Sequence, residues 1–278
     1  ASEAYRKSLS LKPNQPDVWI SFGNFYFRGK SYQQSVSAYQ SALKHDPENA
    51  KAQNNLGSAY MEMGQLEKAA FHFASATKID VGYALAYRNV GDVNIRLGNF
   101  SEAIEWLRKA TEVGPENLFG WYWLGRAYVG AGQPKTAIPH FLRVLSRRPE
   151  LPQVHHDLGE AYFITGNYEK AMEYVQTGMR INPTGPKSYV TLSRIYINLG
   201  RQRAALAIIE KGTEANPSSA AKSSFNSYSR YSVPPPSSIN CFAANQISPS
   251  TQPPPRVPAP EPSSLTSNLA PGFCGVDP

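Results

Sequence analysis

Cysteine is almost absent from this chain of 278 residues, and its two copies, Cys241 and Cys274, both lie near the carboxyl end. The first 217 residues therefore have to fold without any disulfide. Long apolar runs are also missing, so no membrane-spanning segment is expected. Neither a secretory signal nor a transit peptide is recognisable. Because the chain does not begin with Met, we expect it to be processed, trimmed or part of a longer protein.

Motifs that would indicate catalysis are missing as well. The sequence has no glycine-rich phosphate-binding loop, no nucleophile elbow and no pair of carboxylates at a catalytic spacing. The adjacent His155 and His156 would point to different faces of a helix, so they would not chelate a metal ion together. His72 and His140 have no Cys or carboxylate at ligand spacing. The sequence thus predicts that the chain is not an enzyme and has no cofactor or metal site.

The formal net charge of +7 and the isoelectric point near 9.3 raise the question of nucleic-acid binding. The last 61 residues carry three basic and two acidic side chains, a net +1, which leaves +6 for the rest of the chain. In that larger part acidic and basic residues alternate and form no basic run, whereas nucleic-acid binding favours clustered positive charge. A nucleic-acid partner is therefore not expected.

A fixed period of 34 residues is the strongest feature that the sequence does contain. It is marked by a proline at every step except one, where Val81 stands instead. A glycine, replaced by Ser193 in one unit, recurs at the same step. An aromatic residue follows it three positions later, with Asn94 as the one exception, and no unit contains an insertion. Such a period indicates stacked supersecondary units in place of one globular core. The prolines are Pro13, Pro47, Pro115, Pro149, Pro183 and Pro217.

Each unit has the pattern of two amphipathic helices. In the clearest unit Trp121, Leu124, Gly125 and Tyr128 fall at spacings of three and four, which places them on one face of a first helix. Ala137, Phe141 and Val144 do the same for a second helix. Glycine and alanine are expected where the two axes come closest, because a larger side chain would push the helices apart. The fold class predicted is all-α.

The unit Trp121-x-x-Leu124-Gly125-x-x-Tyr128, followed by Ala137-x-x-x-Phe141 and Pro149, resembles the tetratricopeptide repeat (TPR). The resemblance covers about residues 1 to 219 and implies a right-handed superhelical solenoid of antiparallel helix pairs. It predicts a solenoid over 1–217, made of a half repeat and six full repeats. The half repeat is 1–15, and the full repeats are 16–49, 50–83, 84–117, 118–151, 152–185 and 186–219.

The composition changes abruptly after Pro217. Residues 218–278 hold 12 Pro and 14 Ser, so this segment has too little apolar content to form a core and is expected to be an irregular, low-complexity tail. Four residues at helical spacing would fit a short capping helix near 219–232: Ala221, Phe225, Tyr228 and Tyr231. Whether Cys241 and Cys274 pair, and whether the Asn99-Phe100-Ser101 sequon is glycosylated, depends on a compartment that the sequence does not indicate.

The resemblance also implies that the first helices line a concave groove, whose exposed side chains bind a partner. By that register the groove includes Ile20, Phe27, Asn54, Ser58, Asp92, Phe119, His156, Asp157, Glu160, Lys187 and Val190. The residues predicted to bind the partner are Asn24, Asn55, Arg88, Asn89, Tyr122, Trp123, Arg126 and Arg194. Aromatic residues and arginine together are the residue types enriched at protein interfaces, although Trp123 would equally fit packing against a neighbouring repeat.

A well-known variant of the family binds a carboxyl-terminal carboxylate with two asparagines and three basic residues. Asn24 and Asn55 match the asparagines, but Ile20, Leu85 and Asn89 occupy the basic positions. Without those charges the charge-assisted contacts to a carboxylate are lost, so this chaperone-binding mode is rejected. Asn55 and Asn89 also resemble two rungs of an asparagine ladder that holds a peptide backbone, which Trp123 and Asp157 then interrupt.

The function predicted is a scaffold that binds a peptide or a partner protein in the groove. Two alternatives stay open. In one, the chain is a structural subunit that associates head to tail through the ends of the solenoid, because the first repeat is incomplete. In the other, it is the targeting arm of a larger enzyme such as a glycosyltransferase.

Overall fold

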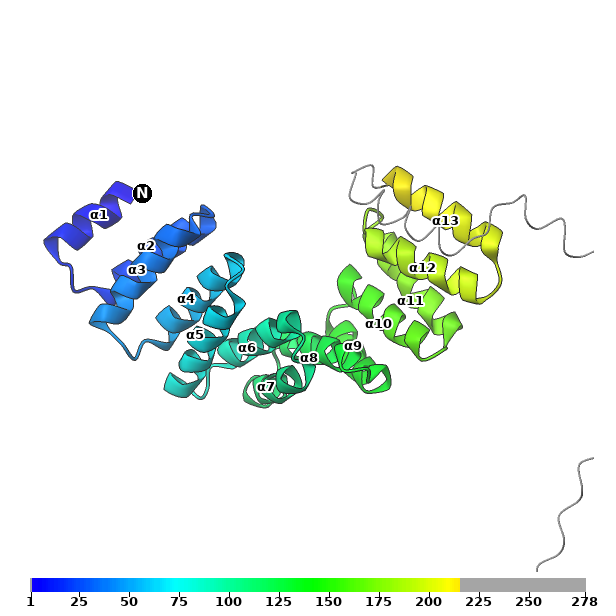
Figure 1. Ribbon diagram of the computed structural model, residues 1–278, viewed down its shortest axis with the longest axis horizontal. Helices are drawn as coiled ribbons and strands as arrows, with labels where there is room; N and C mark the ends of the chain where they lie inside the picture. Colours follow the sequence, from blue (N-terminus) through cyan, green and yellow to red (C-terminus); the bar gives the residue numbers. More distant parts are fainter. Residues whose placement is uncertain (1, 216–278) are drawn as a thin grey trace, which may run out of the picture. The chain divides into compact units, whose positions relative to one another are not determined.

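The structure, a computed structural model, describes residues 2–215. All regular elements in this range are α-helices, thirteen in number, and they follow one another along the stack in chain order (Figure 1). The predicted all-α solenoid of antiparallel helix pairs is confirmed. None of the described helices has both the length and the hydrophobicity that crossing a bilayer requires. The tail 218–278 and the capping helix expected near 219–232 lie outside the described residues.

One single helix precedes six helix pairs. The single helix is α1 (Ser2–Leu11). The pairs are α2 (Pro16–Arg28) with α3 (Tyr32–His45), α4 (Ala50–Glu62) with α5 (Leu66–Ile79), α6 (Ala84–Leu97) with α7 (Phe100–Val113), α8 (Leu118–Gly130) with α9 (Pro134–Arg147), α10 (Pro152–Ile164) with α11 (Tyr168–Ile181), and α12 (Pro186–Asn198) with α13 (Gln202–Ala215).

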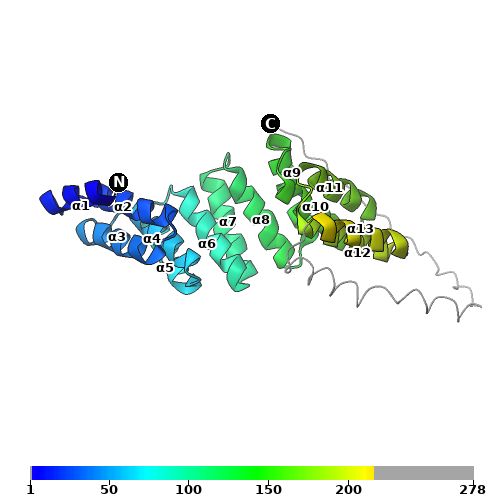
Figure 2. The ribbon, with the colours of Figure 1, turned by 90° about the horizontal axis from the view of Figure 1, so that it is seen from above.

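Every helix packs on its neighbours in the chain, so each pair covers the next (Figure 2). First helices also touch one another directly, as α6 and α8 do, and as α10 and α12 do. The first helices of adjacent pairs therefore share one side of the stack, and the second helices share the other. This arrangement brings residues that are one repeat apart in the sequence next to each other in space.

The turn inside each pair uses the same backbone geometry. Gly64 has φ +73°, and the Gln65 amide donates to the Tyr60 carbonyl at 2.9 Å, which closes the end of α4. Gly98, Gly132, Gly166 and Gly200 repeat the positive φ. The first pair has Lys30 at this position, with φ +57°, a conformation that is unfavourable for a residue with a Cβ.

The residue at the fourth position of the first helix ties that helix to the preceding loop. The Trp121 indole donates to the carbonyl of Pro115, six residues earlier, at 2.8 Å. The same contact recurs from Trp19 to Pro13 at 2.9 Å and from the Tyr189 hydroxyl to Pro183 at 2.8 Å. All three side chains pack in or against the apolar clusters of the stack. The structure shows that they also satisfy a loop carbonyl, which explains why side chains with a polar hydrogen occupy this position.

The closest approach of the two helices in a pair lies at the repeated glycine. A Cβ added to Gly125 would lie 2.7 Å from Cε1 of Phe141, and Ala137 beside them is fully buried. Gly57 faces Phe73 in the same way, with 2.8 Å to Cδ1. The expectation that small residues mark the helix contact is confirmed at these positions.

The helix α1 packs on α2 as a second helix packs on the first helix of the next pair. The Tyr5 ring stacks on Phe22 with 5.3 Å between ring centroids, and Leu9 is buried. Leu11 at the end of α1 is 74% exposed, and Phe25 on α2 is 39% exposed. Large exposed apolar side chains are thus few on α1 and α2.

Two histidines on second helices stack on a tyrosine of the paired first helix. The His72 ring lies parallel to Tyr60 at 5.3 Å, and its Nδ1 lies 2.8 Å from Oε1 of Gln53. The His140 ring lies parallel to Tyr128 at 5.4 Å and packs on Trp121 on its other side. Burial lowers the pKa of both imidazoles, and Arg108 and Arg143 lower that of His140 further. Both rings are therefore neutral stacking partners at neutral pH.

We expect acidification to destabilise the fold through these histidines. Their folded-state pKa values lie below the unfolded value of about 6.5, so the unfolded chain binds more protons as the pH falls below that value. The free energy of unfolding should therefore decrease between about pH 7 and pH 5. Urea unfolding followed by circular dichroism at several pH values measures this slope. Replacing both His72 and His140 with Gln should flatten it, and an unchanged slope would contradict the assignment.

Candidate binding face

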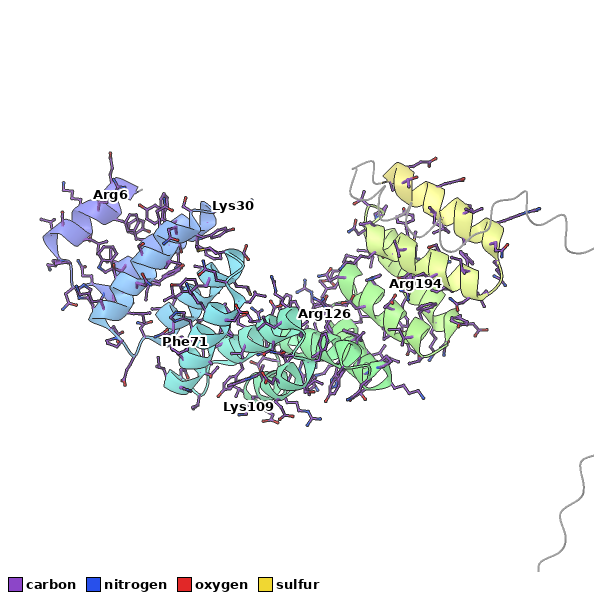
Figure 3. The ribbon with its side chains drawn as sticks, in the orientation of Figure 1. Arg6, Lys30, Phe71, Lys109, Arg126 and Arg194 are labelled. Atoms are coloured by element: carbon purple, nitrogen blue, oxygen red, sulfur yellow. The ribbon has the colours of Figure 1, made fainter. Side chains whose placement is uncertain are left out.

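Three residues of α8 and one of α10 form a cluster on the first-helix side, called here the aromatic–arginine cluster: Tyr122, Trp123, Arg126 and Asp157. The Arg126 Cζ lies 4.7 Å from the centroid of the Trp123 ring, and the Tyr122 hydroxyl donates to Oδ2 of Asp157 at 2.9 Å. The Nε atom of Arg126 lies 3.7 Å from the same carboxylate oxygen. The side chain of Arg126 keeps 35% of its surface exposed, and it extends from α8 in Figure 3. A guanidinium over an aromatic face and near a carboxylate is held in place yet still accessible.

The titration behaviour of the cluster follows from burial. Burial, followed by the charge of Asp157, raises the pKa of the Tyr122 phenol, so the hydroxyl remains a neutral donor to that carboxylate. Burial lowers the pKa of His156, and the adjacent Asp157 opposes this effect. His156 is therefore neutral near pH 7. The fixed charges of this region are then those of its arginine, lysine and carboxylate side chains.

The asparagines on α2, α4 and α6 form a hydrogen-bonded chain, called here the asparagine chain. Asn55 donates to Oδ1 of Asn24 at 3.1 Å, and the Tyr39 hydroxyl donates to the same oxygen at 2.6 Å. Asn89 donates to Oδ1 of Asn54 at 2.8 Å. Asn54 lies 3.5 Å from Asn55, which links the two halves. The asparagine amides thus bond to one another from helix to helix.

Two of these asparagines were expected to be exposed in the groove, and the structure corrects this. Asn54 is 3% exposed and Asn89 is 5% exposed. Their amides satisfy each other because residues one repeat apart meet where adjacent first helices touch. Asn24 and Asn55 remain partly exposed. Of the two positions that resemble rungs of an asparagine ladder, Asn55 stays partly exposed, whereas the Asn89 amide donates to Asn54 inside the stack.

Two further expected groove residues are also buried. Ile20 is 3% exposed and belongs to the apolar core between the first pairs. Asp92 is 7% exposed and forms an ion pair with Arg96 on the same helix at 3.1 Å. Phe119, in contrast, is 53% exposed. The register of the first helices indicates which side faces outward, but not which of these side chains the neighbouring first helix covers.

The two remaining arginines among the predicted site residues already have partners. Arg88 donates to Oδ1 of Asn89 at 2.6 Å, and burial lowers its pKa while Asp92 opposes this shift. Its buried Nε has no hydrogen-bond partner among the described residues. Arg194 donates to Glu160 at 2.7 Å and lies over the Phe163 ring. Arg126 is thus less constrained than either, because its one carboxylate contact is long.

Two pockets lie beside the aromatic–arginine cluster, and the sequence analysis did not predict either. The α8–α10 pocket has a volume of about 270 Å³ and is lined by Glu116, Asn117, Leu118, Phe119, Tyr122, Val144, Arg148, Leu151, Gln153 and Val154. The α10–α12 pocket has about 260 Å³ and is lined by Tyr122, Arg126, Pro152, Gln153, His156, Asp157, Gly178, Asn182, Gly185, Pro186, Lys187 and Ser188. Tyr122 and Gln153 line both pockets, so they separate one from the other.

A sequence signal for the α10–α12 pocket exists in retrospect. Gly178 occupies the repeat position that holds Ala42, Ala76, Ala110 and Val144 in earlier units. Gly185 occupies the position that holds Asn49, Tyr83, Asn117 and Leu151. Both glycines line the pocket. Two larger side chains are therefore missing at the same place, which leaves room between α10 and α12.

Among residues 2–215, no three His, Cys, Asp or Glu side chains are grouped as metal ligands. His155 instead lies with its Nε2 2.7 Å from the Pro149 carbonyl, the loop contact that Trp121 makes in the preceding repeat. The two adjacent histidines do point to different surroundings, since His156 lines the α10–α12 pocket.

Comparison with family models identifies the repeats. A model described as TPR repeat matches residues 23–64, and models described as tetratricopeptide repeat match residues 50–116, 122–186 and 165–223. The chain belongs to the tetratricopeptide repeat family. No curated protein sequence matches it.

Several solved structures share this fold at low sequence identity. PilW, described as a type IV pilus biogenesis factor, is 22% identical with a TM-score of 0.68, and the match covers 75% of this chain and 97% of PilW. PilF of Pseudomonas aeruginosa is 19% identical with a TM-score of 0.64, covering 76% and 96%. YrrB, described as a TPR protein with an unusual peptide-binding site, is 21% identical with a TM-score of 0.57, covering 68% and 97%. At these identities the likeness is one of fold.

Proposed function

We propose that the chain is a non-catalytic scaffold that binds a segment of a partner protein on its first-helix side, centred on α8. The observation that supports this most is the aromatic–arginine cluster. Tyr122, Trp123 and Arg126 are partly exposed and lie about one helical turn apart, and Asp157 of the next pair contacts Tyr122 and Arg126. Anchors of this kind dominate binding energies when they are preorganised.

The two pockets beside the cluster support an extended segment as the ligand. At about 260 and 270 Å³ each is smaller than the roughly 300–1,000 Å³ typical of a site for a whole small molecule. Each volume suits a single side chain. A chain that crosses Tyr122 and Gln153 would place one side chain in each pocket, as extended peptides do when they bind through successive side chains.

The family and the fold favour the same role. Repeats of this family generally serve binding and not catalysis, and YrrB, which shares the fold, is described as having a peptide-binding site. In α8, α10 and α12 the first-helix side carries the aromatic–arginine cluster and the walls of two pockets. We therefore propose binding as the task of this part of the chain.

Changing both Trp123 and Arg126 to Ala should abolish partner binding. Each truncation at an interface anchor costs about 2 kcal/mol or more, so the loss should exceed about thirtyfold in affinity. Affinity capture from a lysate, with quantification of each captured protein, compares the variant with the unchanged chain. Circular dichroism checks that helicity is retained.

The chain offers a matched control on a second helix. Lys109 lies over the Trp106 ring at 5.4 Å, with the same three-residue spacing as Trp123 and Arg126 (Figure 3). Changing Trp106 and Lys109 to Ala removes the same chemistry from α7 and should leave binding intact. Partners that both variants lose equally, or that both retain, would rule out a site centred on α8.

A further inference from the structure

The charges around the α10–α12 pocket do not balance. Arg126 and Lys187 line it as cations, and Asp157 lines it as a carboxylate. Burial lowers the pKa of His156, Asp157 and Glu160 oppose this shift, and Lys187 and Arg126 add to it to a smaller extent. Glu160, the next carboxylate along α10, accepts hydrogen bonds from Arg194 and Thr191. The pocket lining thus keeps one positive charge in excess.

Lys187 is the free charge of this group. It is exposed at the start of α12 and forms no ion pair with any residue that the structure describes. Arg126 is also only loosely engaged, with its Nε 3.7 Å from Asp157. The buried Nδ1 of His156 has no hydrogen-bond partner within residues 2–215. This nitrogen is itself inaccessible, so the charged groups at this pocket that favour a ligand of opposite sign are Lys187 and Arg126.

The backbone at the same pocket adds to the attraction for an anion. The helix α12 begins with Pro186, and its N-cap is Gly185, which has no side chain to accept from the first amides. By contrast, Asn117 caps α8 by accepting from the Phe119 amide. The first amides of a helix have no acceptor within it and carry the positive end of the helix dipole. At α12 the first residue, Pro186, has no amide hydrogen, and the next two residues, Lys187 and Ser188, line the pocket.

The α8–α10 pocket has different chemistry. Phe119 is 53% exposed at its rim, and the nearly fully buried Val144 and Val154 also line it, together with Leu118 and Leu151. Its two charged residues, Glu116 and Arg148, have opposite charges, so the lining has no net charge. Arg148 is moreover paired with Glu150. This pocket therefore favours an apolar side chain.

We propose that the α10–α12 pocket is a binding site for the carboxylate side chain of an acidic residue in a partner peptide, whose neighbouring apolar side chain occupies the α8–α10 pocket. Lys187 and the first amides of α12 bind the carboxylate, and Arg126 supports it from α8. This inference rests on the proposed function, because it specifies what the peptide must carry to bind on this side.

A single carboxylate fits the charge of this pocket better than a phosphoryl group does. Two cations and one carboxylate leave a net charge of +1. A carboxylate brings −1 and neutralises it, whereas a phosphorylated side chain brings about −1.5 to −2. Asp157 would repel that additional charge from within the same pocket.

Selection from a library of short random peptides displayed on phage tests this proposal with the full chain as bait. The selected sequences should carry Asp or Glu at a fixed distance from an apolar residue. With Lys187→Glu as bait, the acidic preference should change to Lys or Arg while the apolar preference stays. Lys135→Glu is the matched control, because it makes the same charge change at an exposed position of α9. Circular dichroism verifies the fold of each bait.

Affinities of one selected peptide, synthesised with blocked ends, complete the test. Replacing its acidic residue with the corresponding amide should weaken binding to the unchanged chain about tenfold and should strengthen binding to Lys187→Glu, whose reversed charge repels the acidic residue. Two results would overturn the carboxylate site while the proposed scaffold function stands. Either the selected peptides show no acidic preference, or the acidic preference persists with Lys187→Glu as bait. A phosphoserine version that binds more tightly than the acidic one would overturn it too. Failure to select any peptide would overturn both.

Discussion

Alanine in place of Phe141 is expected to lower the free energy of unfolding by about 3–5 kcal/mol. The Phe141 side chain is fully buried in α9, and its ring fills the space left by Gly125 on α8. Its ring centroid also lies 6.1 Å from that of Tyr122. Removing the ring leaves a cavity at the closest approach of the two helices, where glycine supplies no atom to fill it. Urea unfolding followed by circular dichroism measures the loss.

Phe71 provides the matched control. It is also a phenylalanine on a second helix, α5, but it is 67% exposed, and Phe71→Ala should change stability by no more than about 0.5 kcal/mol. Because each pair of a solenoid is stabilised mainly by its neighbours, the Phe141 variant is also expected to unfold over a broader transition. Equal losses for the two variants would contradict the assignment of Phe141 to the core.

The fold could be predicted because each copy of the repeat carries the same information, so one deviating copy does not change the result. Val81 stands where the other units have proline, yet α5 ends at Ile79 as the period requires. Lys30 stands where later units have glycine, yet the turn keeps its positive φ. Pro139 lies inside α9, where a proline removes a helical hydrogen bond, and the helix continues through it. In these places packing of the pair outweighs the local preference.

The part of the candidate site that lies on a single helix could be predicted from the sequence, and the rest could not. Tyr122, Trp123 and Arg126 are close in sequence, so helical spacing alone brings them together. The burial of Asn54 and Asn89 depends on contact between neighbouring first helices, and a single repeat carries no signal for that contact. The α10–α12 pocket depends on Gly178 and Gly185, which stand at positions where earlier units have larger side chains.

Valine in place of Gly159 is expected to destabilise the fold by about 3 kcal/mol and to disturb the site as well. A Cβ at this position on α10 would lie 2.5 Å from Cγ2 of Val175 and 3.2 Å from backbone atoms of α11. Val175 is fully buried and β-branched, so it has little rotamer freedom with which to move away. The helices must therefore separate. Because α10 carries His156 and Asp157, peptide binding should weaken together with stability.

Two further variants isolate the steric cause. Gly29→Val introduces the same side chain at an exposed glycine, where a Cβ would find its nearest atom at 3.5 Å, and should change stability by less than about 1 kcal/mol. Adding Val175→Ala to Gly159→Val removes the atom that the new side chain meets first. The double variant should therefore be more stable than the sum of the two single losses predicts, because contacting residues do not act independently. Strictly additive losses in urea unfolding would show that Gly159 is not required for the approach of α10 to α11.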